Sequence, residues 1–476
     1  MTVTGLVMIP LGLLIILLPW RYSLLAFPAF SIMNSAGVVN VGSFGLLPGY
    51  FFGMLVVART AVEIVLLPTP LNAHVIRWLT PLFLFTMICF VSIWVGLTFF
   101  QGKIMVISSE AGFNLNLAQP YTFQRQNLTQ PFYLVLNLAI VYALAHQVAR
   151  LAPGQIAATL HRGVIYAILF ASAVSIWEMA GFYYGVPFFA SFFHSNVGYE
   201  EAHGQVLFGN ILRVSGPFSE PSVLAYRFAG FVLYAWYVYL RRPSTRAMGI
   251  LLLCVTMMLA STSTSAYATL GVFVLLMVKD LAVKVATGPT QIRLSMHHVG
   301  VAALLGIAAL GALVFIQSYW YEINNVLTRM VVEKHHSGSF AQRTGAEMLA
   351  LDILIQTGGI GIGLGGHRPS TLIMALLSNT GIAGFLIYSF FLFQLLRPRQ
   401  AACAEVDLQP YRWMTIGMLL VGMISSPAIN SLALAMSFGM IIGALVAKRQ
   451  PAADRPVSTW RTPLSARGGA PTFSSP

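Results

Sequence analysis

The sequence predicts an all-α polytopic membrane protein with about 12 to 13 transmembrane helices, and three observations support this class. Hydrophobic residues make up 57% of the 476-residue chain, charged residues only 9%, and the mean hydropathy is +0.77. Soluble domains carry about 25% charged residues. The apolar runs are long and unbroken, as membrane helices require, whereas strands of a membrane barrel alternate with period two. The 32 Phe, 18 Tyr and 8 Trp exclude a disordered chain.

The apolar runs predict about thirteen membrane spans, each needing about 20 apolar residues. Their approximate limits are 4–19, 23–39, 48–67, 79–100, 128–150, 163–186, 221–240, 247–260, 265–279, 299–319, 370–396, 411–426 and 431–447. The weakest predictions are the first two spans and the pair on either side of 261–264.

The positive charge predicts orientation rather than nucleic-acid binding. Of the 27 Lys and Arg residues behind the net charge of +13, 18 flank the spans on one side and 7 on the other, with Arg59 and Arg227 inside spans. The richer side is cytoplasmic by the positive-inside rule. We therefore predict one integral membrane domain over residues 1–447, and a disordered cytoplasmic tail over 448–476, which is rich in Pro, Ser, Gly and Arg.

Three loops on the outer side are long enough to fold, at about 101–127, 187–220 and 320–369. The cytoplasmic loops are mostly short and basic, with nothing resembling a nucleotide site. We therefore expect the chemistry of this chain at the outer face.

The loop over 187–220 brings an arginine and a carboxylate to the edge of a span. Arg213 precedes a Gly-Pro turn, and Glu220 precedes Pro221, the first residue of the next predicted helix. Glu220 has two interpretations: a helix cap, or a carboxylate facing a polar cavity. Arg227 lies two turns further along the same helical face, and an arginine inside a span usually lines such a cavity. Glu178 lies inside another span and is a weaker candidate for a charged residue that lines a polar cavity.

The loop over 320–369 carries a second arginine and a glycine run. A short amphipathic helix is predicted over 341–356, with Arg343 in its first turn, where an ordinary pair with Glu347 is the competing interpretation. Gly361 and Gly363 allow close backbone approach, so their N–H groups could converge on an anion. The alternative is a flexible re-entry turn. A dinucleotide site is disfavoured because the motif requires a preceding strand.

His367 and Arg368 follow the glycine run at the start of the next span. An ordinary pKa near 6.5 makes His367 a candidate proton acceptor. His335 and His336 lie earlier in the loop, but the spacing fits no metal motif, so we predict no metal and no cofactor. Two outer loops that each offer arginine and a titratable partner suit a pyrophosphate-linked lipid, which arginine binds bidentately.

Three segments carry a family resemblance: Arg213 to Ala225 (RVSGPFSEPSVLA), Arg343 to Gly365 ending in GIGIGLG, and Asn379 to Gly384 (NTGIAG). With the overall layout of spans, they resemble the bacterial O-antigen and exopolysaccharide repeat-unit polymerases within the O-antigen ligase-like superfamily. Those relatives place arginines in two large periplasmic loops, the second followed by glycines. Arg213 and Arg343 match these positions.

The resemblance implies a metal-independent glycosyltransferase of C-type architecture in a Gram-negative inner membrane, active at the periplasmic face. Such enzymes join oligosaccharides linked to undecaprenyl pyrophosphate, among membrane lipids and beside a chain-length regulator and a flippase of the same pathway. On this hypothesis Arg213 and Arg343 bind pyrophosphate or sugar acids. Glu220 or His367 accepts the proton of the acceptor hydroxyl, and Arg368 supports the phosphate.

Three other functions stay open: a ligase, a transporter or flippase, and a non-catalytic membrane scaffold. A scaffold would not need two folded outer loops that carry arginine and titratable partners. In the ligases of this superfamily, which transfer glycan to lipid A-core or protein, a histidine after the glycine run belongs to the site, and His367 occupies a similar place. A transporter or flippase of lipid-linked sugars should carry ionisable groups through the mid-bilayer and paired broken helices. The sequence offers no convincing broken pair and only four ionisable exceptions inside spans: Arg59, Glu63, Glu178 and Arg227.

Overall fold

The computed structural model describes residues 1–42, 44–67, 70–108, 117–197, 206–207, 211–287, 338–397, 406–427 and 429–447. The helices of this part are α1 (Val3–Leu17), α2 (Trp20–Phe30), α3 (Pro48–Leu66), α4 (Ala73–Val95), the π-helical turn η1 (Gly96–Phe100), α5 (Gln126–Arg150), α6 (Pro153–Tyr184), α7 (Ala190–Phe193), α8 (Pro221–Arg241), α9 (Thr245–Ala260), α10 (Thr264–Thr287), α13 (Gly338–Gln356), α14 (Leu372–Leu396), α15 (Gln409–Ser425) and α16 (Leu432–Ala447). The predicted span 299–319, the tail 448–476, His335 and His336 lie outside the described residues.

Short antiparallel hairpins are the β structure of the described chain. They pair β1 (Val39–Val41) with β2 (Phe44–Leu46), β3 (Met105–Val106) with β4 (Gln119–Pro120), and β5 (Val206–Leu207) with β6 (Ile211–Leu212). Each hairpin lies in a connection between helices, so the described chain is mostly helical, which is consistent with the predicted all-α class.

Six helices of the described chain are long and apolar enough to cross a membrane, which is consistent with a multi-pass membrane protein: α3, α4 continued through η1, α5, α6, α8 and α14. Helices α1, α9 and α16, and the segment Thr264–Lys279 of α10, are apolar but shorter. Helix also covers most of the predicted spans 4–19, 247–260, 265–279, 411–426 and 431–447. The total of 12 to 13 spans stays a prediction. The limits 23–39 were wrong: α2 ends at Phe30, because Asn34, Ser35 and Gly37 favour turns that lead into β1.

Helix α16 lies inside the bundle, and nearly all of its residues are buried. It packs along α5, where Gly439 and Gly443 face the partner helix. A side-chain carbon at Gly443 would lie 2.7 Å from the carbonyl oxygen of Ala145. Glycines spaced by four residues allow this close backbone approach, a common packing mode of membrane helices.

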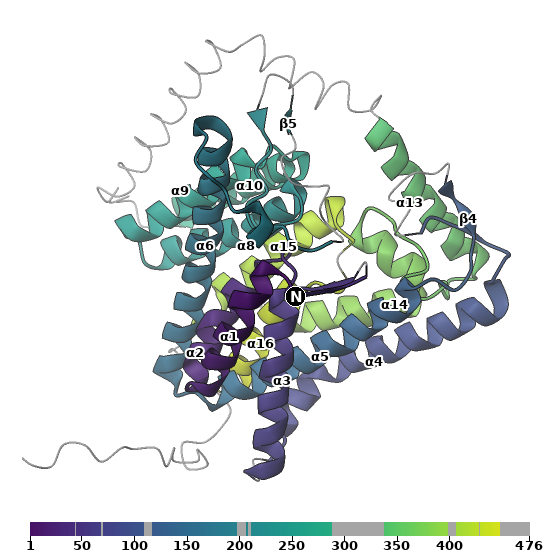
Figure 1. The fold of residues 1–476 in the computed structure, drawn as a ribbon, viewed down its shortest axis with the longest axis horizontal. Helices are drawn as coiled ribbons and strands as arrows, with labels where there is room; N and C mark the ends of the chain where they lie inside the picture. Colours follow the sequence, from purple (N-terminus) through teal and green to yellow (C-terminus); the bar gives the residue numbers. More distant parts are fainter. Residues whose placement is uncertain are drawn as a thin grey trace, which may run out of the picture.

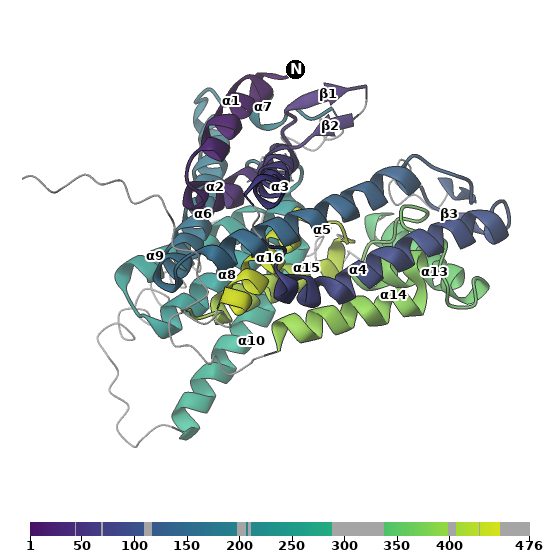
Figure 2. The ribbon, with the colours of Figure 1, turned by 90° about the horizontal axis from the view of Figure 1, so that it is seen from below.

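Helices α4, α5 and α14 run beside one another along one part of the long axis of the molecule (Figures 1 and 2). Helix α5 has 25 residues and is therefore about 37 Å long at 1.5 Å per residue. Its first residue, Gln126, touches the glycine run at Gly365. Its last residue, Arg150, reaches Glu63 near the end of α3. The two ends of α5 thus lie in two separate polar regions, at a separation that suits opposite membrane surfaces.

Candidate functional site

A buried carboxylate holds the loop that carries Arg213. Glu178 in α6 accepts hydrogen bonds from the Ser215 N–H (2.9 Å), the Ser215 hydroxyl (2.9 Å) and the Gly216 N–H (2.6 Å). Gly216 has a φ of +58°, and a Cβ there would overlap the hydroxyl of Ser175. Glu178, suspected from the sequence of lining a polar cavity, therefore anchors the turn that follows Arg213.

Replacing Glu178 with glutamine is expected to destabilise this loop by about 1–3 kcal/mol, because one amide N–H would face the buried backbone donors and leave them unsatisfied. The thermal unfolding midpoint of the purified protein measures the effect. Asp407→Asn is the matched control, since Asp407 pairs with Arg241 at the exposed surface (3.3 Å) and such pairs contribute about 0–1 kcal/mol. Equal midpoints for the two variants would contradict the anchoring role.

The structure brings the two predicted arginines together. The pKa of the Arg213 guanidinium is lowered, mainly by burial and in smaller part by the positive charge of Arg343. Glu220 and Tyr267 of α10 act in the opposite direction and raise it. Charges influence a guanidinium in this way only from nearby. Arg213, in the loop before α8, therefore lies within electrostatic reach of Arg343 in α13, although 130 residues of chain separate the two arginines. Both side chains are half-buried.

Glu220 occupies the cap position of α8 with an extended backbone, but its side chain makes no capping hydrogen bond. Its carboxylate accepts a hydrogen bond from the Ser222 hydroxyl (2.9 Å), and the residue is exposed. Glu220 therefore occupies the cap position with its backbone, but its side chain does not cap the helix. The carboxylate lies at the membrane edge of α8, within electrostatic reach of Arg213.

Arg227 does not join this group. Its guanidinium is buried and donates to the carbonyl oxygen of Ser31 (2.5 Å), which ties α8 to the end of α2. The neighbouring Tyr226 hydroxyl donates to Ser431 (3.0 Å) before α16. The substrate-binding role predicted for Arg227 does not fit this arrangement, because its charged group serves helix packing.

The glycine run does not present its N–H groups to an anion. The Gly361 N–H donates to the Thr357 hydroxyl (3.0 Å), and the Gly363 N–H donates to the Asn379 carbonyl (2.8 Å). The Ile362 N–H between them donates to the Ser378 carbonyl (3.0 Å). The predicted anion-binding role of Gly361 and Gly363 does not fit this arrangement, because both N–H groups already donate to protein acceptors. The re-entry turn interpretation is closer, and the turn is tightly packed.

The Ser378 and Asn379 acceptors lie at a break in α14 that the sequence did not lead us to predict. Gly381 has a φ of +69° and a ψ of −172° inside this helix. The break frees the carbonyls of Ser378 and Asn379, which the glycine run satisfies, and Ile382 N–H donates back to the Gly359 carbonyl (2.8 Å). Irregular backbone at membrane depth requires such internal partners. The available signal was the polar segment Asn379-Thr380-Gly381 in an apolar span.

His367 is buried and both of its ring nitrogens are engaged. The Ile107 N–H donates to Nδ1 (3.2 Å), and Nε2 lies 3.1 Å from the Ala346 carbonyl, to which it donates. The backbone of His367 exchanges two 3.1 Å hydrogen bonds with the Asn379 side chain. The predicted role of His367 as a proton acceptor does not fit, because a nitrogen that already accepts from a backbone N–H has no free lone pair.

Protonation of His367 is expected to destabilise the protein in mild acid. Burial lowers the pKa of His367 from 6.5 to about 4, against smaller opposing effects of the Ala346 carbonyl and Glu347. The unfolded chain therefore binds this proton first. The stability that the buried, neutral His367 contributes is fully present above pH 6.5. It is lost as the pH falls toward 4, an effect on the free energy of unfolding on the order of 3 kcal/mol. The unfolding midpoint of His367→Gln should fall less between pH 7 and pH 4.5 than that of the unchanged protein. Identical pH dependences would contradict this assignment.

Glu347 joins α13 to the start of α14. Its carboxylate accepts hydrogen bonds from the N–H groups of Ser370 (2.6 Å) and Thr371 (2.9 Å) and from both hydroxyls. Arg368 lies between these elements; its N–H donates to the Ile107 carbonyl (3.1 Å), and its side chain is half-buried. Glu347 thus orients α13, the helix that carries Arg343. Figure 1 shows α13 beside α14 and β4 at one end of the long helices.

The arrangement as a whole combines two converging arginines and one exposed carboxylate on a rigid support. The support consists of Glu178 under one loop, and of the glycine run, His367 and Glu347 under the other. In comparisons with known proteins, no protein-family model and no curated protein matches this chain. Its function is therefore inferred from these residues.

Proposed function

We propose that this protein is an exopolysaccharide or O-antigen polymerase, which joins repeat units carried on undecaprenyl pyrophosphate at the periplasmic face of the inner membrane. The observation that supports the proposal is that Arg343 and Glu220 both lie within electrostatic reach of Arg213. Two guanidinium groups suit a pyrophosphate, and a neighbouring carboxylate suits an acceptor hydroxyl. The C-type glycosyltransferase architecture and the inner-membrane location belong to this proposal.

In the proposed reaction, the oxygen of a sugar hydroxyl attacks the anomeric carbon of a second, lipid-linked glycan. The bond from that carbon to the pyrophosphate oxygen breaks, and its electron pair leaves with the lipid pyrophosphate. Arg213 and Arg343 stabilise the negative charge that develops there. The hydroxyl proton passes to the carboxylate of Glu220, which replaces His367 as the proposed base because its oxygens are exposed.

The size of the lipid-linked and secreted glycans after deletion of the gene tests this function. A single repeat unit on the carrier without long polymer is the expected result. Full-length polymer stranded on the carrier would instead identify a ligase. Repeat units trapped on the cytoplasmic face would identify a flippase. Reintroducing the intact gene should restore polymer, which controls for effects on neighbouring genes.

A further inference from the structure

An apolar groove lies on the outside of the bundle between α3, α4 and α5. Its volume is about 520 Å³, within the range of roughly 300–1,000 Å³ that small-molecule sites occupy. Thirteen residues line it: Val57, Thr60, Ala61, Ile64, Ile76, Leu79, Thr80, Phe83, Val135, Leu138, Ala139, Tyr142 and Ala143. Three candidate membrane spans form its walls, so its apolar lining matches the hydrocarbon chains of a lipid.

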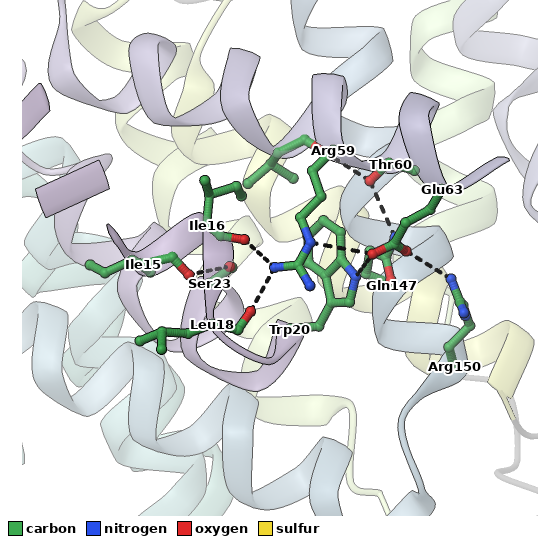
Figure 3. Close-up of polar contacts among 11 residues, drawn as sticks. Ile15, Ile16, Leu18, Trp20, Ser23, Arg59, Thr60, Glu63, Gln147 and Arg150 are labelled. Atoms are coloured by element: carbon green, nitrogen blue, oxygen red, sulfur yellow. Dashed lines mark hydrogen bonds and ion pairs between the residues drawn. The ribbon is translucent and has the colours of Figure 1, made fainter. Parts of the chain in front are cut away.

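A polar cluster adjoins the groove where α3 and α5 end (Figure 3). Glu63 is its centre: one carboxylate oxygen accepts from Trp20 (2.7 Å) and Arg59 (3.3 Å), and the other from Gln147 (3.2 Å) and Arg150 (3.0 Å). Thr60 joins the two regions, because it lines the groove and accepts a hydrogen bond from Gln147 (3.3 Å). The apolar and polar parts therefore form one continuous surface.

The cluster carries excess positive charge at the end of the groove. Two arginines share the single carboxylate of Glu63. The guanidinium of Arg59 already has partners within the protein: it lies 4.2 Å from the Trp20 ring centre and donates to the Leu18 carbonyl (2.6 Å). Arg150 is 33% exposed, and Arg77, one residue from groove-lining Ile76, is exposed. Arg77 and Arg150 can therefore reach an anion from outside.

A buried histidine marks the same end. His146 lies one helical turn beyond Tyr142, and its ring stacks on that groove-lining tyrosine (5.8 Å between ring centres). It is 3% exposed, and neither ring nitrogen has a hydrogen-bond partner among the described residues. It also interacts electrostatically with Arg150 and Glu63. Both nitrogens are enclosed by protein, so His146 packs behind the groove-lining Tyr142 and does not itself line the groove.

We propose that the groove and this cluster bind an anionic phospholipid. An acyl chain lies in the groove, and the phosphate lies against Arg77 and Arg150. Basic pockets between membrane helices on the cytoplasmic side bind anionic headgroups in this way, and the predicted orientation places this end of α5 there. The inference does not rest on the proposed function, because the lipid site lies at the Arg150 end of α5. Gln126, at the other end of α5, contacts the glycine run of the candidate functional site.

Native mass spectrometry of the purified, delipidated protein titrated with phosphatidylglycerol or phosphatidylcholine tests the proposal. We expect phosphatidylglycerol to bind at least tenfold more tightly. Arg77→Gln should weaken its binding about fivefold, and Arg77→Gln with Arg150→Gln about thirtyfold, because each basic residue near an anionic headgroup contributes comparably. Ala61→Trp, which fills the groove, should weaken both lipids. Arg246→Gln on α9 is the matched control, an exposed arginine on a helix remote from the groove.

Three results would overturn the proposal. One is equal binding of the two lipids by the unchanged protein. Another is full phosphatidylglycerol binding by Arg77→Gln, a surface change that should leave folding intact. The third is that undecaprenyl phosphate binds more tightly than phosphatidylglycerol and depends on the same arginines. The occupant of the groove would then be an isoprenoid carrier. The lipid titration does not involve glycan synthesis, so its failure and that of the proposed polymerase are separable.

Discussion

Replacing Arg343 with alanine is expected to lower the rate of polymer formation about 10²–10³-fold, and replacing Arg213 should have a similar effect. This is the loss seen when one preorganised donor to a developing negative charge is removed. The two arginines interact with each other, so the double variant should lose less than the product of the two single effects. The measurement is the initial rate of glycan chain growth in membrane vesicles supplied with lipid-linked repeat units.

Lysine substitutions separate charge from geometry at the same positions. Arg343→Lys keeps the positive charge but loses the planar pair of donors, so it should retain only part of the activity. Arg162→Ala is the matched control, because Arg162 is an exposed arginine of α6 at the predicted cytoplasmic side. Each variant must accumulate in the membrane at the normal level. Unchanged polymer from the Arg213 and Arg343 double variant would remove the site assignment.

Replacing Gly363 with alanine is expected to destabilise the protein by roughly 3–5 kcal/mol, at the upper end of single-substitution effects. Gly363 has a φ of +95°, where an L-residue is strained by about 1–2 kcal/mol. A Cβ there would also overlap the backbone of Ile93 in α4, so the glycine run would have to move away from that helix. The thermal unfolding midpoint and the amount of protein in the membrane report this change.

Gly102→Ala distinguishes dihedral strain from overlap with a neighbouring helix as the cause of the destabilisation. Gly102 shares the positive φ (+76°), but a Cβ there meets no atom of the described residues within 4 Å. This control should therefore lose only the dihedral strain. If Gly363→Ala and Gly102→Ala lowered the midpoint equally, close packing of the glycine run against α4 would not be what requires Gly363.

Sequence periodicity predicted the helical class and the approximate positions of most helices, because these depend on local apolar runs. It placed Arg213 beside a turn and Glu220 at the start of a helix, since proline and glycine determine both locally. The convergence of Arg213 with Arg343 was outside its reach. The meeting of two loops 130 residues apart depends on tertiary contacts such as that between Glu178 and Gly216.

The errors have the same physical origin. His367 and Gly363 belong to residue types that can perform acid–base or anion chemistry, and the sequence does not reveal whether their polar atoms are free. Their partners are Ile107, Ala346 and Asn379, which other elements contribute. The break at Gly381 was missed because the polar segment Asn379-Thr380-Gly381 is too short to interrupt the apolar run over 370–396.

The break in α14 has a consequence for biogenesis. A half-helix that enters the bilayer with free carbonyls at Ser378 and Asn379 lacks the internal partners that hydrocarbon requires. Those partners are the N–H groups of Ile362 and Gly363, which precede α14 in the chain and leave the ribosome first. The re-entry turn and the broken helix therefore form one unit for insertion. We expect the translocon to release α14 into lipid only after the turn has folded back against it.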